Sequence, residues 1–296
     1  MTRTGAAALV ALVLGAPVAR AQLPFLTGQD GGKPIGIQAE NGIEWQQNNH
    51  VYIARGHAKA TRGDGSVQAD TLYAYYRPAG PAPPAAAAKD AKTDPFSGGS
   101  TEIYRIEADG DVRFTTPTQT LTGDHAVYDI DDALLVVTGK QLRLETPRQT
   151  ITARDSFEWY DAKQIGVARG DAVATRDDRH VRADVLTAIV EKDRNGAQRI
   201  SRINANGNVI VTSPGQIARG DAGVYNLDTG IATLAGHVRL TRGDNELRGR
   251  YAVVDLNRNV SRLLSAPPGV KVAGGRADRV EGMLIPRHKP PESAGH

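Results

Sequence analysis

The stretch that decides the fold is Ile103–Ile130, which reads IYRIEADGDVRFTTPTQTLTGDHAVYDI. It holds a glycine, a short alternating run, a turn at Pro117 and a second alternating run. In the first run, Val112 and Phe114 alternate with the polar Arg113. A period of two is typical of a β-strand with one buried face, so the stretch predicts two strands joined by a turn.

A glycine and an aspartate 14 residues apart mark this two-strand module, and the pair recurs along the chain. The copies are Gly56 to Asp70, Gly110 to Asp124, Gly170 to Asp184 and Gly207 to Asp221, with Gly139 to Asp155 two residues longer and Gly236 to Arg250 lacking the aspartate. A fixed period of this kind predicts stacked β-modules, because one module cannot bury its apolar face alone.

The six modules form two sets of three. The second interval between glycines is 29 residues in both sets, from Gly110 to Gly139 and from Gly207 to Gly236. We interpret this as a duplication of a three-module block, with internal triplets at about 52–160 and 165–257. The pattern amounts to about 13 or 14 strands, and a sheet of that size curls, splits or closes. The predicted fold is therefore all-β, an elongated antiparallel β-jellyroll built from about six two-strand repeats.

Composition narrows the possible functions. The chain has no cysteine, which excludes disulfides and thiolate metal sites, and its 15 aromatic residues are few for 296 positions. The formal charge of +3 falls to +1 when Arg3 and Arg20 are removed with the leader described next. A nearly neutral chain without a long basic run does not favour nucleic acid as a partner.

The ends and one internal segment differ from the repeats. Residues 1–21 combine Arg3, an apolar run and Ala19-Arg20-Ala21, the pattern of a secretory signal peptide that is cleaved on export. The expected organisation is a flexible arm at 22–33, the β-jellyroll at 34–264 and a C-terminal tail at 265–296. A disordered insert, rich in Pro, Ala and Gly, is expected within the jellyroll at 77–100.

The repeated aspartates are the first candidates for chemistry. One carboxylate per module is too few for a calcium loop, which gathers several oxygen ligands in one segment. An aspartate that accepts a local hydrogen bond at a strand bend explains the pattern better. Neither a metal-binding histidine motif nor a nucleophile elbow is present, so we expect no catalytic residues, no metal, no cofactor and no enzyme activity.

The apolar positions are the second candidates, since they repeat with the modules. They are Val112, Phe114, Leu142, Leu144, Val209, Val211, Val238 and Leu240 after the glycines, with Leu72, Tyr128, Trp159, Leu186 and Tyr225 after the aspartates. Two interpretations remain open: the filled core of a sandwich, or the lining of a groove that admits an acyl chain.

The sequence resembles a known family at these same positions. The run PIGIQAENGIEW from Pro34, the Gly56-x-Ala58-x-Ala60 strand, Ala69-Asp70-x-Leu72 and their later copies look like the OstA-like domain of the LptA-type lipopolysaccharide-transport proteins. The resemblance covers roughly residues 34–260. It implies a periplasmic, non-enzymatic β-jellyroll that binds lipopolysaccharide and shields the acyl chains of lipid A in a hydrophobic groove.

The resemblance also implies partners. Proteins of this family stack end to end and join an LptC-like inner-membrane protein to an LptD-like outer-membrane protein. The chain departs from the pattern in its length, in the 77–100 insert and at Arg250. The alternatives are an exported structural β-repeat scaffold without a lipid groove, or another jellyroll of the same transport system, LptC-like or LptD-like.

Overall fold

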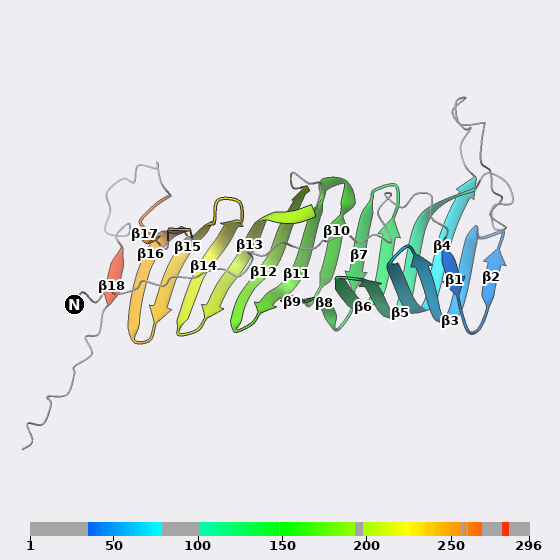
Figure 1. Cartoon of the computed structure of the whole chain (residues 1–296), viewed down its shortest axis with the longest axis horizontal. Coiled ribbons are helices and arrows are strands. Elements are labelled where there is room, and N and C mark those ends of the chain that lie inside the picture. Colours follow the sequence, from blue (N-terminus) through cyan, green and yellow to red (C-terminus); the bar gives the residue numbers. More distant parts are fainter. Residues whose placement is uncertain are drawn as a thin grey trace, which may run out of the picture. The chain divides into compact units, whose positions relative to one another are not determined.

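A computed structural model gives the structure, and it describes residues 35–78, 101–147, 149–192, 198–255, 257–258, 260–267 and 280–283. These residues form 18 strands and one short 3-10 helix, which confirms the predicted all-β fold (Figure 1). Every strand pairing described below is antiparallel. The predicted signal peptide at 1–21 and the arm at 22–33 lie outside the described residues.

The strands follow one another closely along the chain. The first eight are β1 Gly36–Gln38, β2 Ile43–Gln46, β3 Val51–Arg62, β4 Gly65–Pro78, β5 Thr101–Thr116, β6 Gln119–Asp129, β7 Leu134–Thr138 and β8 Leu142–Thr146. The next six are β9 Gln149–Ala153, β10 Ser156–Tyr160, β11 Ile165–Arg176, β12 Arg179–Lys192, β13 Gln198–Ser213 and β14 Gln216–Asn226, with the 3-10 helix η2 at Asp161–Lys163. The last four are β15 Ile231–Arg242, β16 Asn245–Asp255, β17 Val260–Leu264 and β18 Glu281–Met283.

The chain divides into two compact units. The N-terminal unit comprises Ala16–Ala174 with Thr187–Ser201, and the described residues of the C-terminal unit fall within Thr175–Leu186 and Arg202–His296. The division passes through β11, β12 and β13, and it therefore differs from the boundary between the predicted triplets at 52–160 and 165–257.

Long strands in each unit pair as hairpins that bend in the middle. β3 pairs with β4 from Arg62↔Gly65 to Val51↔Tyr75, and the register shifts once, between Arg55 and Ala58. The same shift occurs in β5 against β6 and, in the C-terminal unit, in β13 against β14. Extra residues in one strand of a pair bend it, so each hairpin has an upper half, next to Val51 or its counterpart, and a lower half that ends in the tight turn.

Several strands are interrupted at the level of this bend. β1 and β2 both pair with β3, β7 and β8 both pair with β6, and β17 and β18 both pair with β16. In each case a continuous strand carries two short neighbours, one on each side of the bend. The bend therefore runs across the strands of each unit as one line.

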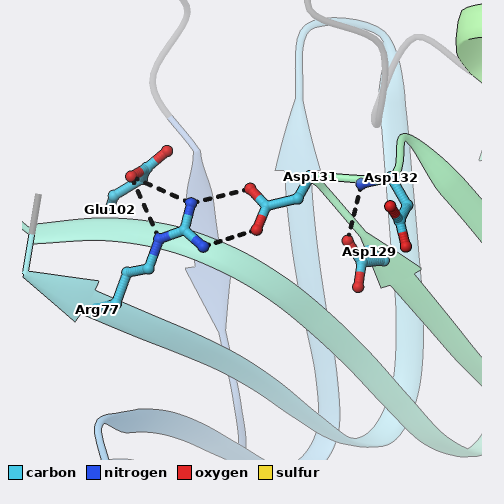
Figure 2. A network of polar contacts seen from close by, with 5 residues as sticks. All are labelled: Arg77, Glu102, Asp129, Asp131 and Asp132. Atoms are coloured by element: carbon cyan, nitrogen blue, oxygen red, sulfur yellow. Dashed lines mark hydrogen bonds and ion pairs between the residues drawn. The ribbon is translucent and has the colours of Figure 1, made fainter. Parts of the chain in front are cut away.

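A network of ion pairs joins the end of β4, the start of β5 and the turn after β6 (Figure 2). The guanidinium of Arg77, in β4, donates to both carboxylate oxygens of Asp131 at 2.6 and 2.9 Å and lies 3.4 Å from Glu102 in β5. Asp131 lies in the turn between β6 and β7, where Asp129 accepts a bond from the backbone N–H of Asp132 at 3.0 Å. The network ties three strand ends together.

Two of the expected boundaries differ from the structure. Arg77 and Pro78, expected in the insert, belong to β4, and the rest of that segment up to 100 lies outside the described residues. The region 265–296, expected to be a tail, contains β18, whose three residues pair with β16. Pairing with the edge of β16 explains why Glu281–Met283 form a strand.

Candidate functional site

The line of bends depends on a glycine in each module. These glycines have positive φ: Gly56 (80°), Gly110 (78°), Gly139 (155°), Gly170 (82°), Gly207 (76°) and Gly236 (72°). A Cβ atom added to Gly110 would lie 2.2 Å from Oδ2 of Asp70, and one added to Gly207 would lie 2.1 Å from Oδ2 of Asp184. Five of these six positions, all except Gly56, therefore require a glycine for two reasons: the backbone has positive φ, and an aspartate lies where a side chain would be.

The repeated aspartates lie against these glycines, as a role at the bend requires. Asp124 accepts a bond from the backbone N–H of Lys140 at 2.8 Å. Asp184 accepts one from the Asn208 side chain at 2.9 Å, and Asp221 lies 2.7 Å from Nδ1 of His237. Among the described residues, no three or more potential ligands gather as a metal site would need. The carboxylates therefore stabilise the bends through these contacts.

The first module uses other residues at the same place. Asn41 lies against Gly56, and Nδ1 of His57 lies 3.0 Å from the Glu40 carboxylate. The hydrogen bond with Glu40 raises the pKa of His57, and the charge of Glu40 adds to the effect. This pair ties the connection between β1 and β2 to β3.

Above the bend, small apolar side chains form a row across the N-terminal unit. Neighbours in register are Ile43, Ala54, Leu72, Ala108, Ala126, Val137, Phe157 and Ala168. All except Ile43 are buried. We call the face that carries this row the inner face.

Below the bend the inner face continues with a second row. Its neighbours in register are Ile37, Ala60, Val67, Phe114, Leu121, Leu144 and Ile151. Val112 and Leu142 lie next to it, nearer the bend, and both are almost fully buried. Arg113 and Arg143, on the intervening positions, are exposed on the opposite, outer face.

The C-terminal unit repeats this arrangement. Val211, Ala218, Leu240 and Leu247 are neighbours in register below the bend, and Ala205, Gly223, Leu234, Ala252 and Leu263 are neighbours above it. The predicted residues Leu186, Val209, Tyr225 and Val238 are buried in this unit as well. The inner-face parity, which the sequence left open, is thus assigned in both units.

An electrostatic interaction links the upper and lower halves of the N-terminal unit. The Tyr128 phenol, on the inner face above the bend, has a raised pKa because it is buried and because Asp161 lies nearby, while the charge of Arg62 opposes that rise. Arg62 lies at the lower tip of β3, on the inner-face parity of Ala58 and Ala60. A residue below the bend and a residue above it therefore lie close enough to interact electrostatically.

Of the thirteen predicted apolar residues, eleven are buried. Leu144 and Trp159 are half-buried. The thirteen predicted residues fall into two sets, one in each unit. Within each set, the structure brings the residues onto one face.

The sequence analysis missed the inner-face residues of the edge strands. Ile37 in β1, and Ile43 and Trp45 in β2, are 43%, 44% and 52% exposed. The alternation Ile43-Glu44-Trp45 was the available signal, although it is short. Their exposure has a simple cause: among the described residues β1 and β2 pair with β3 alone, so the inner face ends at them without a cover.

The bent-hairpin fold and its continuous apolar face define an antiparallel β-jellyroll with an amphipathic sheet. A family model described as LptA/(LptD N-terminal domain) LPS transport protein matches residues 36–155 and 150–260. The chain belongs to this family of lipopolysaccharide-transport proteins.

Comparisons with solved structures and with curated proteins carry no further argument about this chain. LptH of Pseudomonas aeruginosa, described as the LptA-homologous periplasmic component of the lipopolysaccharide transport device, is 21% identical, with a TM-score of 0.38 over 47% of this chain and 95% of that one. No curated protein matches the chain. In the part of the chain that the structure describes, no helix is long and apolar enough to cross a membrane.

Proposed function

We propose that this chain is a periplasmic bridge protein of the LptA type, which binds lipopolysaccharide and carries it from the inner to the outer membrane. The acyl chains of lipid A lie along the inner face, which the thirteen predicted apolar residues line. Residues 1–21 direct export and are then cleaved. The protein has no catalytic step to perform.

The observation that carries this proposal is the unbroken register of apolar side chains across the strands of each unit. Each CH₂ group exposed to water costs about 0.8 kcal/mol, so an acyl chain of a dozen carbons faces a barrier of roughly 10 kcal/mol. An inner face of Val, Leu and Ala removes most of that cost. Because these side chains are buried against each other, an acyl chain replaces one set of apolar contacts by another as it enters.

The edge strands support end-to-end assembly. Strands that pair on one side only present free backbone groups to another chain. The exposed Ile37, Ile43 and Trp45 lie at one such edge, and Val260 and Met283 at the other, in the C-terminal unit. We propose that these edges join copies of this chain to one another, to an LptC-like inner-membrane protein and to an LptD-like outer-membrane protein.

Photocrosslinking tests the lipid site directly. A photoreactive residue at Phe114 or Val211, both buried on the inner face, is expected to form adducts with lipopolysaccharide. The matched control is Arg113, the adjacent residue on the outer face, where no adduct is expected. Absence of adducts at all inner-face positions would favour the alternative, a structural scaffold with a filled core.

A second alternative is another jellyroll of the same system, LptC-like or LptD-like. Amino-terminal sequencing of the exported protein addresses the first of these, because a mature chain that begins at Gln22 has lost any membrane anchor. A chain that keeps residues 1–21 would contradict the bridge proposal.

A further inference from the structure

Aromatic side chains gather along the upper rim of the inner face in the N-terminal unit. One register line crosses its strands through Trp45, Tyr52, Ala74, Ile106, Tyr128, Leu135, Trp159 and Gly166. It lies two residues further from the bend than the row of small apolar residues. Both tryptophans of the chain belong to it, and we call its four aromatic members, Trp45, Tyr52, Tyr128 and Trp159, the aromatic row.

The end of the row at β2 is a preformed platform. The Trp45 indole stacks on the Tyr52 ring with centroids 5.7 Å apart and an interplanar angle of 19°. Tyr52 in turn contacts Tyr76 at 5.0 Å, and the Trp45 N–H donates to the Tyr76 hydroxyl at 2.7 Å. The indole is thereby fixed, yet it is 52% exposed at an edge where the described residues provide no further strand.

Polar groups accompany the row at its other end. The Trp159 N–H lies 3.3 Å from the Asp161 carboxylate, which also accepts a bond from the Gln164 side chain at 2.9 Å. The Arg62 charge acts on Tyr128 from the lower half. Aromatic rings with one apolar side and one polar end are typical of a boundary between apolar and aqueous surroundings.

We propose that the aromatic row binds the pyranose rings of a glycolipid head group whose acyl chains lie deeper on the inner face. This inference rests on the proposed function. The apolar C–H faces of a sugar stack on exposed aromatic rings, and its hydroxyls bond to Asp161 and Gln164. The position matches the chemistry, because the aromatic row lies next to the apolar row of the inner face, and its end at Trp45 is 52% exposed to water.

The competing occupant is an apolar side chain from another protein copy that docks at the β2 edge. Such a contact needs hydrophobic area at Trp45 only. A sugar site needs the flat ring and also involves Trp159, which lies six strand pairings away within the same unit. Substitutions of the two tryptophans therefore distinguish the occupants. A docked side chain depends on Trp45 alone, whereas a sugar site depends on Trp45 and Trp159.

The test uses the full mature chain and two soluble probes, an alkyl glycoside and an alkyl phosphocholine of equal chain length, each below its micelle concentration. Trp45→Leu is expected to weaken alkyl glycoside binding about tenfold and to leave alkyl phosphocholine binding unchanged. Trp45→Phe keeps a ring and retains most of the affinity. Trp159→Phe and Trp45→Phe each leave one tryptophan in the chain. We expect the fluorescence emission of that tryptophan to change when the glycoside binds.

The matched control is Tyr73→Leu. Tyr73 stacks on Tyr75 at 6.4 Å and 15° on the outer face of the same sheet, and its loss should leave both affinities unchanged. Equal losses for both probes in Trp45→Leu, or a loss confined to self-association, would overturn the sugar site and leave the proposed function standing. Failure of the wild-type chain to bind either probe would overturn both.

Discussion

At five of the six bends, a glycine supplies the positive φ of the backbone and an aspartate carboxylate lies against it. Gly110 has φ 78°, and the Asp70 carboxylate occupies the space that a side chain would need. The recurrence of a glycine and an aspartate, more than any apolar residue, identifies the module in the sequence, although each of these glycines lies against the aspartate of the preceding module. Bending is therefore encoded at single positions.

Gly110→Ala tests that role. The substitution combines a left-handed backbone with a contact of 2.2 Å to Asp70, so we expect the free energy of unfolding to fall by about 2–4 kcal/mol. Gly243→Ala is the control, because Gly243 has φ 55° but nothing within 4 Å of the added Cβ. Denaturant unfolding compares the two, and equal losses would contradict a steric role for the carboxylate.

The His57–Glu40 pair predicts a local pH dependence. The pKa of His57 is raised in the folded state, so protonation of His57 favours folding. This contribution to stability is complete below the ordinary pKa of 6.5 and is lost as the pH rises through the folded-state pKa. In Glu40→Gln, the pKa of His57 measured by NMR should fall back towards 6.5. An unchanged titration would show that Glu40 is not the cause.

Among the elements, the split strands decide where assembly is possible. β2 offers a free edge with the exposed side chains of Ile43 and Trp45, whereas the central strand β4 is paired on both sides. Natural sheets protect such edges with charges, and β2 has none on its inner face. Because the β2 edge lacks this protection, we expect another chain to dock there.

Ile43→Lys is expected to weaken self-association. The lysine would face an apolar partner strand, which disfavours edge pairing, without removing a buried side chain. Sedimentation velocity over a range of concentrations measures the shift towards monomer, with Gln68→Lys on the outer face of β4 as the control. A lysine at position 43 that leaves the oligomer distribution unchanged would exclude this edge as the docking site.

At the scale of the whole molecule, each unit has a core of its own. Val112 in the N-terminal unit is 0% exposed, and Val209 in the C-terminal unit is 1% exposed at the equivalent position. In arrays of stacked modules, each module is stabilised by its neighbours, so a destabilising substitution affects its own part of the array first.

Val112→Ala and Val209→Ala are each expected to cost about 1–3 kcal/mol. Hydrogen exchange should rise mainly in the unit that carries the substitution, and comparison of the two variants supplies the control. A uniform rise across both units in either variant would instead indicate that they open together.

The sequence alone determined the strands, the modules and the bends. Alternation at Val112 and Phe114 and the spacing from Gly110 to Asp124 are local properties, because strand pleat and backbone sign are set within a few residues. The resemblance in these same modules anticipated the family. Eleven of the thirteen apolar side chains that the sequence named are buried.

Tertiary structure decided what depends on neighbours. Whether Trp45 would be covered or open depends on β2 having one partner strand, and the aromatic row exists only because register aligns residues from distant strands. The inner-face parity likewise depends on how each bulge shifts the register. Pairing between strands is a long-range property, so spacing along one chain could not supply it.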